Sequence, residues 1–258
     1  IIEMRKILAA LVIFSAVTAA GPSFAELFLQ KHTWEVGAGL SYVTYKEPGV
    51  MKEEGAKAGL FGSYTYHERF MFRTEAELNH GQMDYRGSGT IDDIPNYMFE
   101  VRLLAGRDIP VAKRSIVTPY AGFGYRYLND DSSYMISSTD HIGYERESNY
   151  YYSPIGVETL TELDNGWKAG VRLEYDHFWK GKQISKMGYV PGYHDIENNQ
   201  DGGYGVRGSV RFINRKSFVY VIEPFIRYWD IEDSDLDDGW YEPKNNSTEF
   251  GLRFSSEF

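Results

Sequence analysis

The stretch STEFGLRFSSEF, residues 247–258, decides the fold of this chain. Its apolar side chains stand at every second position or a multiple of it: Phe250, Leu252, Phe254 and Phe258. Small and charged residues lie between them: Gly251, Arg253, Ser255 and Glu257. Because the side chains of a β-strand alternate between two faces, this spacing predicts a strand with one apolar face and one polar face.

The same two-residue period recurs in nine further windows, so the sequence predicts an all-β chain of about ten strands. The windows are residues 33–45, 57–66, 72–79, 97–106, 117–127, 151–159, 167–176, 205–213 and 218–229. In the window 167–176, for example, Val171, Leu173 and Tyr175 alternate with Arg172 and Glu174. None of the windows fits a helical period of 3.6 residues as well.

The links between the windows alternate in length. Those after the second, fourth, sixth and eighth windows are short, such as HER at 67–69 and LDNG at 163–166. Those after the odd-numbered windows are longer and more polar, such as 129–149, 180–202 and 231–246. With an even strand number, this pattern predicts an antiparallel up-and-down transmembrane β-barrel with short periplasmic turns and long extracellular loops.

Residues 4–25 have the pattern of a secretory signal peptide. Arg5 and Lys6 precede the apolar run 7–17, and small residues lead to a cleavage site after Ala25. The run is shorter than the roughly 20 residues that a membrane-spanning helix needs, so an uncleaved anchor helix is the weaker alternative. We therefore expect a mature outer-membrane β-barrel of residues 26–258 without a second domain.

Composition limits the partners that the chain can have. The 258 residues include 27 basic and 37 acidic ones, a formal charge of −10, which becomes −11 without the signal peptide. An acidic chain is a poor match for nucleic acid, so we expect no nucleic-acid partner. There is no Cys, which excludes disulfides and thiolate metal sites.

Alternation alone does not say which face lies inside the barrel. A soluble barrel fills its interior with apolar side chains, whereas a membrane barrel turns them toward lipid. Here the apolar face carries almost no charge over ten strands, although 25% of the chain is charged. Aromatic residues such as Trp34, Trp167 and Tyr228 gather near the strand ends of that face, which suits the membrane–water interface. The apolar face is therefore predicted to face lipid.

In these features the chain resembles the small bacterial outer-membrane β-barrels, a class that includes OmpA-like, opacity-like and omptin-like barrels. Phe258, at the end of an alternating aromatic strand, is similar to the signal that such barrels present to the barrel insertion machinery. Ser256 departs from that signal, since an aromatic or aliphatic residue is usual there. The resemblance implies a monomer in the outer membrane of a Gram-negative bacterium. Its expected partners are outer-membrane lipid, lipopolysaccharide and, through Phe258, the insertion machinery.

The polar face should then line the lumen, with nearly balanced charge. Its acids are Glu35, Glu75, Glu77, Glu100, Glu158, Glu174, Asp176, Glu223 and Glu257, and its bases are Lys57, Arg73, Arg102, Arg126, Lys168, Arg172, Arg207, Arg211, Arg227 and Arg253. A ten-stranded barrel is only slightly wider than one of eight strands, which its inward side chains just fill. These charges predict an ion network that closes the lumen; a narrow, porin-like polar channel is the alternative.

The candidates for catalysis lie in or beside the predicted long loops. Omptin-like proteases carry an acidic pair and an Asp–His pair at the extracellular rim. The residues here that could form a comparable site are Asp84, Asp92, Asp93, His177 and His194. His177 follows Asp176 and His194 precedes Asp195, so a histidine could act as a general base oriented by an aspartate. The spacing differs from that family, in which Asp precedes His by two residues.

The sequence therefore assigns no catalytic, cofactor-binding or metal-binding residue. His141, His177 and His194 stand at no metal-ligand spacing, and neither a phosphate loop nor a nucleophile elbow is present. The expected function is a structural or interaction protein of the outer membrane, with a charge-plugged lumen and acidic extracellular loops. The alternatives are a rim-active hydrolase, either omptin-like or directed at lipid A, and the narrow channel.

Overall fold

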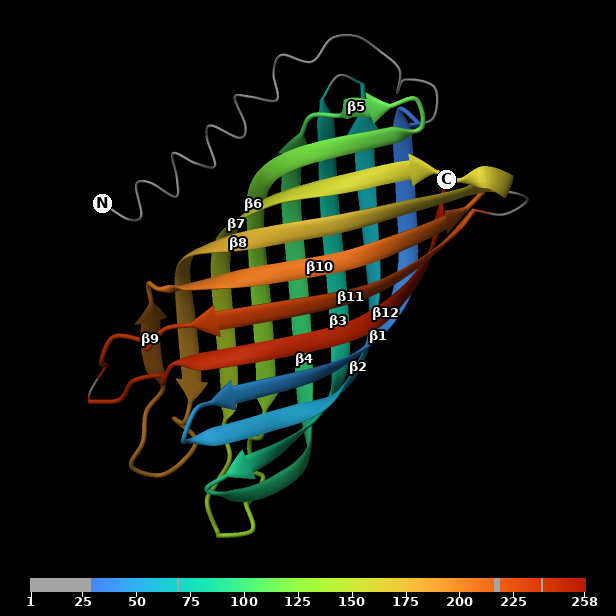
Figure 1. Ribbon diagram of the computed structural model, residues 1–258. Helices are drawn as coiled ribbons and strands as arrows, with labels where there is room; N and C mark the ends of the chain where they lie inside the picture. The colour runs from blue at the N-terminus through green and yellow to red at the C-terminus, as the bar shows by residue number, and fades with distance from the viewer. Residues whose placement is uncertain (1–28, 69, 216–218, 238) are drawn as a thin grey trace.

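Ten long antiparallel strands close into a barrel in the computed structural model, which describes residues 29–68, 70–215, 219–237 and 239–258 (Figure 1). Around the barrel these are β1 (His32–Glu47), β2 (Met51–His67), β3 (Met71–Gly87), β4 (Gly89–Gly106), β6 (Ser115–Asp131), β7 (Glu145–Glu162), β8 (Trp167–Lys186), β10 (Gly203–Asn214), β11 (Tyr220–Ile231) and β12 (Asn245–Glu257). Two short strands extend the sheet: β5 (Ile109–Ala112) beside β6, and β9 (Ile196–Gln200) beside β8. The 3-10 turn η2 (Asp164–Gly166) precedes β8. The all-β barrel prediction is confirmed, and the predicted signal peptide, residues 4–25, lies outside the described residues.

Pairing of the first and last strands closes the barrel. Leu40 in β1 lies opposite Leu252 in β12, and the register continues from Glu35 opposite Glu257 to Lys46 opposite Asn246. Beyond the strand end, the Trp34 amide donates to the Phe258 carbonyl at 2.8 Å, and the Phe258 amide donates to the Trp34 carbonyl at 3.0 Å. Residues 247–258 thus form one of the two strands whose pairing closes the sheet. A closed sheet leaves no unpaired strand edge in lipid.

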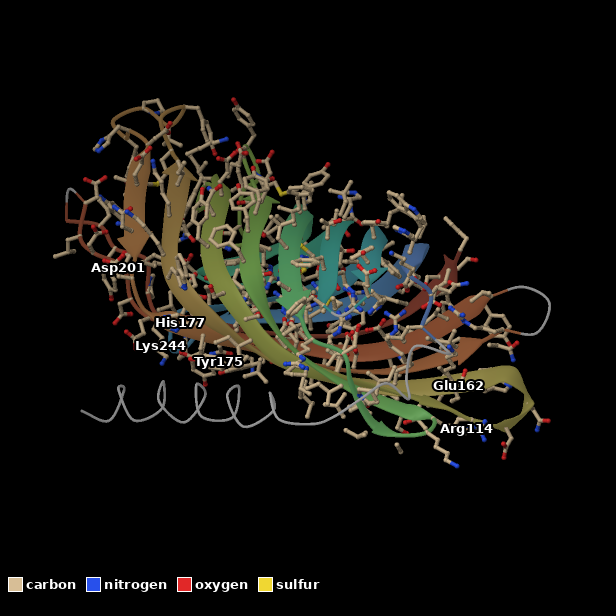
Figure 2. The ribbon with its side chains drawn as sticks, turned by 90° about the horizontal axis from the view of Figure 1, so that it is seen from above. Arg114, Glu162, Tyr175, His177, Asp201 and Lys244 are labelled. Atoms are coloured by element: carbon tan, nitrogen blue, oxygen red, sulfur yellow. The ribbon has the colours of Figure 1, made fainter. Side chains whose placement is uncertain are left out.

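The two faces of the barrel are as predicted. On β8, Leu173 and Tyr175 are exposed on the outer face, whereas the neighbouring Glu174 and Asp176 are buried in the lumen. Figure 2 shows side chains both inside the barrel and on its outer surface, where Tyr175 and His177 lie. Within the described part of the chain no helix is long and apolar enough to cross a membrane.

The prediction of a long loop is wrong at the β1–β2 and β3–β4 connections, because the strands extend through both regions. β1 and β2 are joined by the short turn 48–50, and β3 and β4 turn at Ser88. β8 has 20 residues and β3 has 17, whereas about 9–11 residues cross a bilayer. Above the lipid the outer face of a strand meets water and need not be apolar, so the alternation that marks a strand fades there. Long loops remain at 132–144, 187–195 and 232–244.

Glycine allows large side chains to fill the lumen. A Cβ on Gly124 of β6 would lie 2.2 Å from the ring of Tyr152 on the neighbouring β7. No side chain other than hydrogen fits there without moving that ring. Tyr152 in turn donates its hydroxyl to Glu100 at 2.8 Å, so this glycine positions a member of the lumen network.

The lipid-facing assignment predicts the effect of a new charge. Leu173→Arg should lower the free energy of unfolding by about 2–4 kcal/mol, because its side chain enters the hydrocarbon. Ile136→Arg is the control, because Ile136 is similarly exposed, at 65% against 59% for Leu173, but lies in the loop 132–144. The control should change stability by less than about 0.5 kcal/mol. Denaturant unfolding in lipid vesicles measures both, and equal effects of the two variants would contradict the assignment.

Candidate functional site

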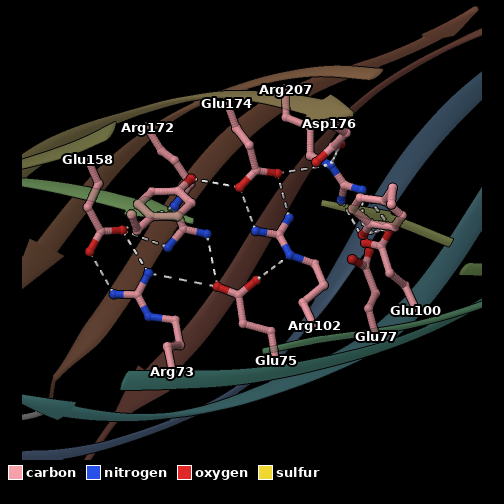
Figure 3. Close-up of polar contacts among 12 residues, drawn as sticks. Arg73, Glu75, Glu77, Glu100, Arg102, Glu158, Arg172, Glu174, Asp176 and Arg207 are labelled. Atoms are coloured by element: carbon pink, nitrogen blue, oxygen red, sulfur yellow. Dashed lines mark hydrogen bonds and ion pairs between the residues drawn. The ribbon is translucent and has the colours of Figure 1, made fainter. Parts of the chain in front are cut away.

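A network of arginine–carboxylate pairs crosses the lumen (Figure 3). Arg102 of β4 donates two hydrogen bonds to Glu174 of β8, at 2.9 and 2.7 Å. Arg73 of β3 donates two to Glu158 of β7, at 2.7 and 2.8 Å. Glu75 connects the two pairs, since its carboxylate lies 3.2 Å from Arg102 Nε and 3.8 Å from an Arg73 nitrogen. Strands that are not neighbours in the sheet are thereby joined across the barrel.

A second group of pairs lies toward the extracellular end. Arg207 of β10 donates to both oxygens of Glu100 at 2.6 and 2.7 Å, and through Nε to Asp176 at 2.6 Å. Arg227 of β11 donates to Glu77 at 2.5 and 2.7 Å. Each planar guanidinium group thus donates hydrogen bonds to carboxylates on other strands. The single ammonium of a lysine could not provide this geometry.

Toward the periplasmic end, Arg211 of β10 binds three carboxylates. Its nitrogens lie 2.9 Å from Glu35 of β1, 3.0 Å from Glu223 of β11 and 3.3 Å from Glu257 of β12. Glu257 also pairs with Arg215 at 3.0 Å. The predicted inward face therefore does form an ion network, and the network extends over much of the barrel length.

Small cavities lie between the pairs. One of about 60 Å³ is lined by Arg102, Arg227 and Arg253, and one of about 90 Å³ lies nearer the periplasm beside Arg73 and Arg215. A water molecule occupies about 30 Å³ in the liquid, so each cavity has room for a few waters. Arginine and glutamate side chains line both of these cavities.

A larger cavity of about 310 Å³ lies at the extracellular mouth, between the β1–β2 and β3–β4 hairpins and the loops 132–144 and 232–244. Arg146 lies on its wall and pairs with Glu47 at 3.0 Å and Glu53 at 2.7 Å. Glu242, from the loop 232–244, accepts a hydrogen bond from Tyr45 at 3.1 Å. Burial and the nearby Glu47 carboxylate together raise the pKa of Glu242 to about 7.

The structure places the predicted acidic group and the histidines apart. Asp84 belongs to β3, and Asp92 and Asp93 belong to β4, so they lie on a hairpin and not in a loop. The Asp93 amide donates to Asp84 at 3.2 Å, which holds this group together. His177 lies on β8, which β6 and β7 separate from β4, and His194 is exposed in the loop 187–195.

Neighbouring positions do not make an aspartate–histidine dyad of Asp176 and His177. Adjacent strand residues point to opposite faces, so Asp176 faces the lumen and His177 faces outward. Asp195, next to His194, accepts the Gly188 amide at 2.8 Å and caps its own loop. Among the described residues, no three His, Asp or Glu side chains are grouped so that they could hold a metal ion.

Some members of the network escaped sequence reasoning. Glu47, Glu53 and Arg146 lie beyond the ends of the predicted strands, where alternation no longer marks the inner face. Glu249 lies inside a predicted strand, on the same face as Arg253, and is 3.6 Å from Arg227. The alternation of side chains along the strand could have identified Glu249 as an inward-facing residue. The sequence holds no comparable signal for Glu47, Glu53 and Arg146.

Comparisons with known proteins agree with this architecture. Residues 7–202 match the family model described as outer membrane protein beta-barrel domain. No curated protein shows significant similarity to the chain. Among solved structures, the outer membrane protease OmpT from Escherichia coli is similar with a TM-score of 0.63 and 11% identity, over 92% of this chain and 100% of that chain. At that identity the likeness shows a shared fold alone.

Two further barrels match over most of their length with lower scores. Neisserial surface protein A has a TM-score of 0.39 and 7% identity, over 87% of this chain and 97% of that chain. Ail, the attachment invasion locus protein of Yersinia pestis, has a TM-score of 0.34 and 10% identity, over 89% of this chain and 100% of that chain. Neither score carries a functional argument.

The lumen network predicts strongly coupled substitutions. Arg102→Met leaves the Glu174 and Glu75 carboxylates without their shared cation, and should lower the free energy of unfolding by about 3–5 kcal/mol. The double variant Arg102→Met/Glu174→Gln should lose less than the sum of the two single variants. Arg114→Met is the control, because Arg114 pairs with Asp164 on the exposed surface, where an ion pair contributes about 0–1 kcal/mol. Additive losses in the double-mutant cycle would contradict the network.

The raised pKa of Glu242 predicts a pH dependence. Between the ordinary value of 4.5 and about 7, folded protein holds a proton at Glu242 that the unfolded chain has released. The free energy of unfolding should therefore fall as pH rises through this window, and this component should level off above about pH 7. Glu242→Gln should reduce the slope of the free energy of unfolding against pH by the contribution of about one proton. Asp201→Asn, at an exposed position outside the mouth, should leave this slope unchanged. Identical unfolding profiles for Glu242→Gln and wild type would contradict the shift.

Proposed function

The chain belongs to the family of outer membrane protein beta-barrel domains, and from this premise we propose that it is a non-conducting barrel of structural or interaction type. Its lumen is closed by charge, and its extracellular end is the surface that it offers to other molecules. The observation that carries this proposal is the set of bidentate pairs across the lumen, Arg102 with Glu174 and Arg207 with Glu100.

The energy of these pairs supports closure. An ion that passed the level of Arg102 would have to displace the guanidinium from the two carboxylates it contacts, Glu174 and Glu75. Removing one partner of a buried pair costs about 3–5 kcal/mol, and a cost of that size would leave an open state populated at roughly one part in 150 or less. Arg207 and Arg227 form further pairs toward the mouth, so an ion would meet more than one such barrier.

The extracellular end supports a role in interaction. The strands extend well past the length that a bilayer requires, and so raise the loops 132–144, 187–195 and 232–244 above it. Apolar side chains are exposed there, including Tyr134, Leu236, Trp240 and Tyr241. The last loop also carries Asp233, Asp235 and Asp237. Exposed apolar groups beside charged ones are typical of protein-contact surfaces.

A planar-bilayer recording tests closure. Refolded protein should insert without stable conductance steps, whereas an open polar pore would give them. Folding is verified separately, because a folded barrel migrates differently from the boiled chain on a detergent gel. Reproducible single-channel steps from protein that shows this shift would overturn the proposal in favour of the channel. Hydrolysis of a peptide or of lipid A by the same preparation, lost on substitution of Asp84 or His194, would favour a rim enzyme.

A further inference from the structure

Below the mouth lies a cavity of about 70 Å³, here called the inner cavity, on which four buried hydrogen-bond donors converge. They are the ammonium of Lys57 on β2, the guanidinium of Arg126 on β6, the amide of Gln183 on β8 and the indole of Trp229 on β11. Their residues are 6%, 5%, 3% and 2% exposed, respectively. Donors from four sides of the barrel thus line one small space.

Three of these four side chains have a donor atom that lacks an acceptor among the described residues. Arg126 Nε, Gln183 Nε2 and Trp229 Nε1 are buried with no hydrogen-bond partner. In that part of the chain neither Lys57 nor Arg126 forms an ion pair, although Arg126 lies over the Trp229 ring at 5.5 Å. A buried donor without an acceptor costs about 1–3 kcal/mol, and an unpaired charge costs more.

The charges on the cavity wall do not cancel. Its two carboxylates, Glu53 and Asp130, both lie beside Arg146, at 2.7 and 3.9 Å. Lys57 and Arg126 then remain, so the lining has three cations against two anions. Glu249, which does not line the cavity, interacts electrostatically with both of these cations. One monovalent anion would bring the wall to neutrality. The same anion would accept the hydrogen bonds that the free donors offer.

We propose that the inner cavity binds one small monovalent anion of about the size of chloride. Its volume is about twice the 30 Å³ share of a liquid water, which admits a halide with a companion water. It is too small for a large organic anion such as gluconate. The one buried acceptor on the wall without a partner, Asn96 Oδ1, is placed to accept from the companion water.

This inference rests on the proposed function in one respect: in a closed lumen the anion is a fixed member of the ion network, not a permeating ion. Its test measures stability and not conductance, so either idea can fail without the other. A conducting barrel whose stability depends on chloride would overturn closure alone. A silent barrel whose stability ignores chloride would overturn the anion site alone.

The experiment is thermal unfolding of the refolded protein in detergent, with sodium chloride replaced stepwise by sodium gluconate at constant ionic strength. Each tenfold increase in chloride above its dissociation constant should raise the unfolding midpoint by about 3–6 °C, because the anion binds the folded state alone. Bromide should act like chloride. Equal midpoints in chloride and gluconate would overturn the proposal.

Three variants locate the site. Lys57→Met keeps the length of the side chain, removes its charge and should abolish the chloride dependence. Lys52→Met is the matched control, because Lys52 lies on the same strand but pairs with Glu54 outside the inner cavity, so it should keep the dependence. Trp229→Phe removes one donor and retains a ring, and should raise the chloride concentration required by about tenfold. An unchanged chloride dependence in both Lys57→Met and Trp229→Phe would overturn the assignment.

A direct observation completes the test and does not depend on any variant folding. Crystals grown in bromide should show an anomalous scattering peak between Lys57 Nζ and the Arg126 guanidinium. Bromide peaks on the outer surface alone, with none in the inner cavity, would overturn the proposal.

Discussion

The structure depends on one constraint: a backbone amide or carbonyl that faces lipid must find its hydrogen-bond partner within the protein. A closed sheet satisfies every such group, and the pairing of β1 with β12 is what closes it. The same lipid repels charge from the outer face, so each strand must carry its polar side chains inward. Ten strands then bring these charges close together inside one barrel, where arginines pair with carboxylates. The ion network follows from closure and crowding together.

The interior of this barrel is therefore polar at one level, unlike the core of a soluble protein, and apolar at another level, like such a core. At the level of Glu75, Arg102 and Glu174 the interior is held by ion pairs, and apolar side chains lie outside. Nearer the extracellular end, Tyr150, Phe178, Trp229 and Ile231 form a buried apolar cluster inside the barrel. Where water and not lipid lies outside a strand, burial of apolar groups inside the barrel is favourable.

This change of solvent also explains how much could be predicted. Where lipid lies outside, the alternation of Leu173 with Arg172 and Glu174 predicts from the sequence alone that the segment is a strand. It also predicts which side chains face lipid and which line the lumen. Beyond the lipid the pattern no longer distinguishes the faces, so the sequence predicts that Asp84 and Asp92 lie in or beside a loop, whereas they lie on a hairpin. Partners were not predictable either. Whether Arg102 meets Glu174 depends on the stagger of β4 against β8 across the lumen, which no local pattern encodes.

The unmatched donors of the inner cavity fall at this transition. Deeper in the lumen, guanidinium groups face carboxylates from opposite strands, and at the mouth Arg146 is shared between Glu47 and Glu53. Between them lies an apolar cluster, of which Trp229 and Tyr150 also line the inner cavity. Among the residues that line this cavity, Lys57, Arg126 and Arg146 outnumber the carboxylates Glu53 and Asp130. A chain that changes from a polar to an apolar interior within one continuous barrel must place some charge at the boundary, and an exchangeable anion can compensate that charge without another carboxylate.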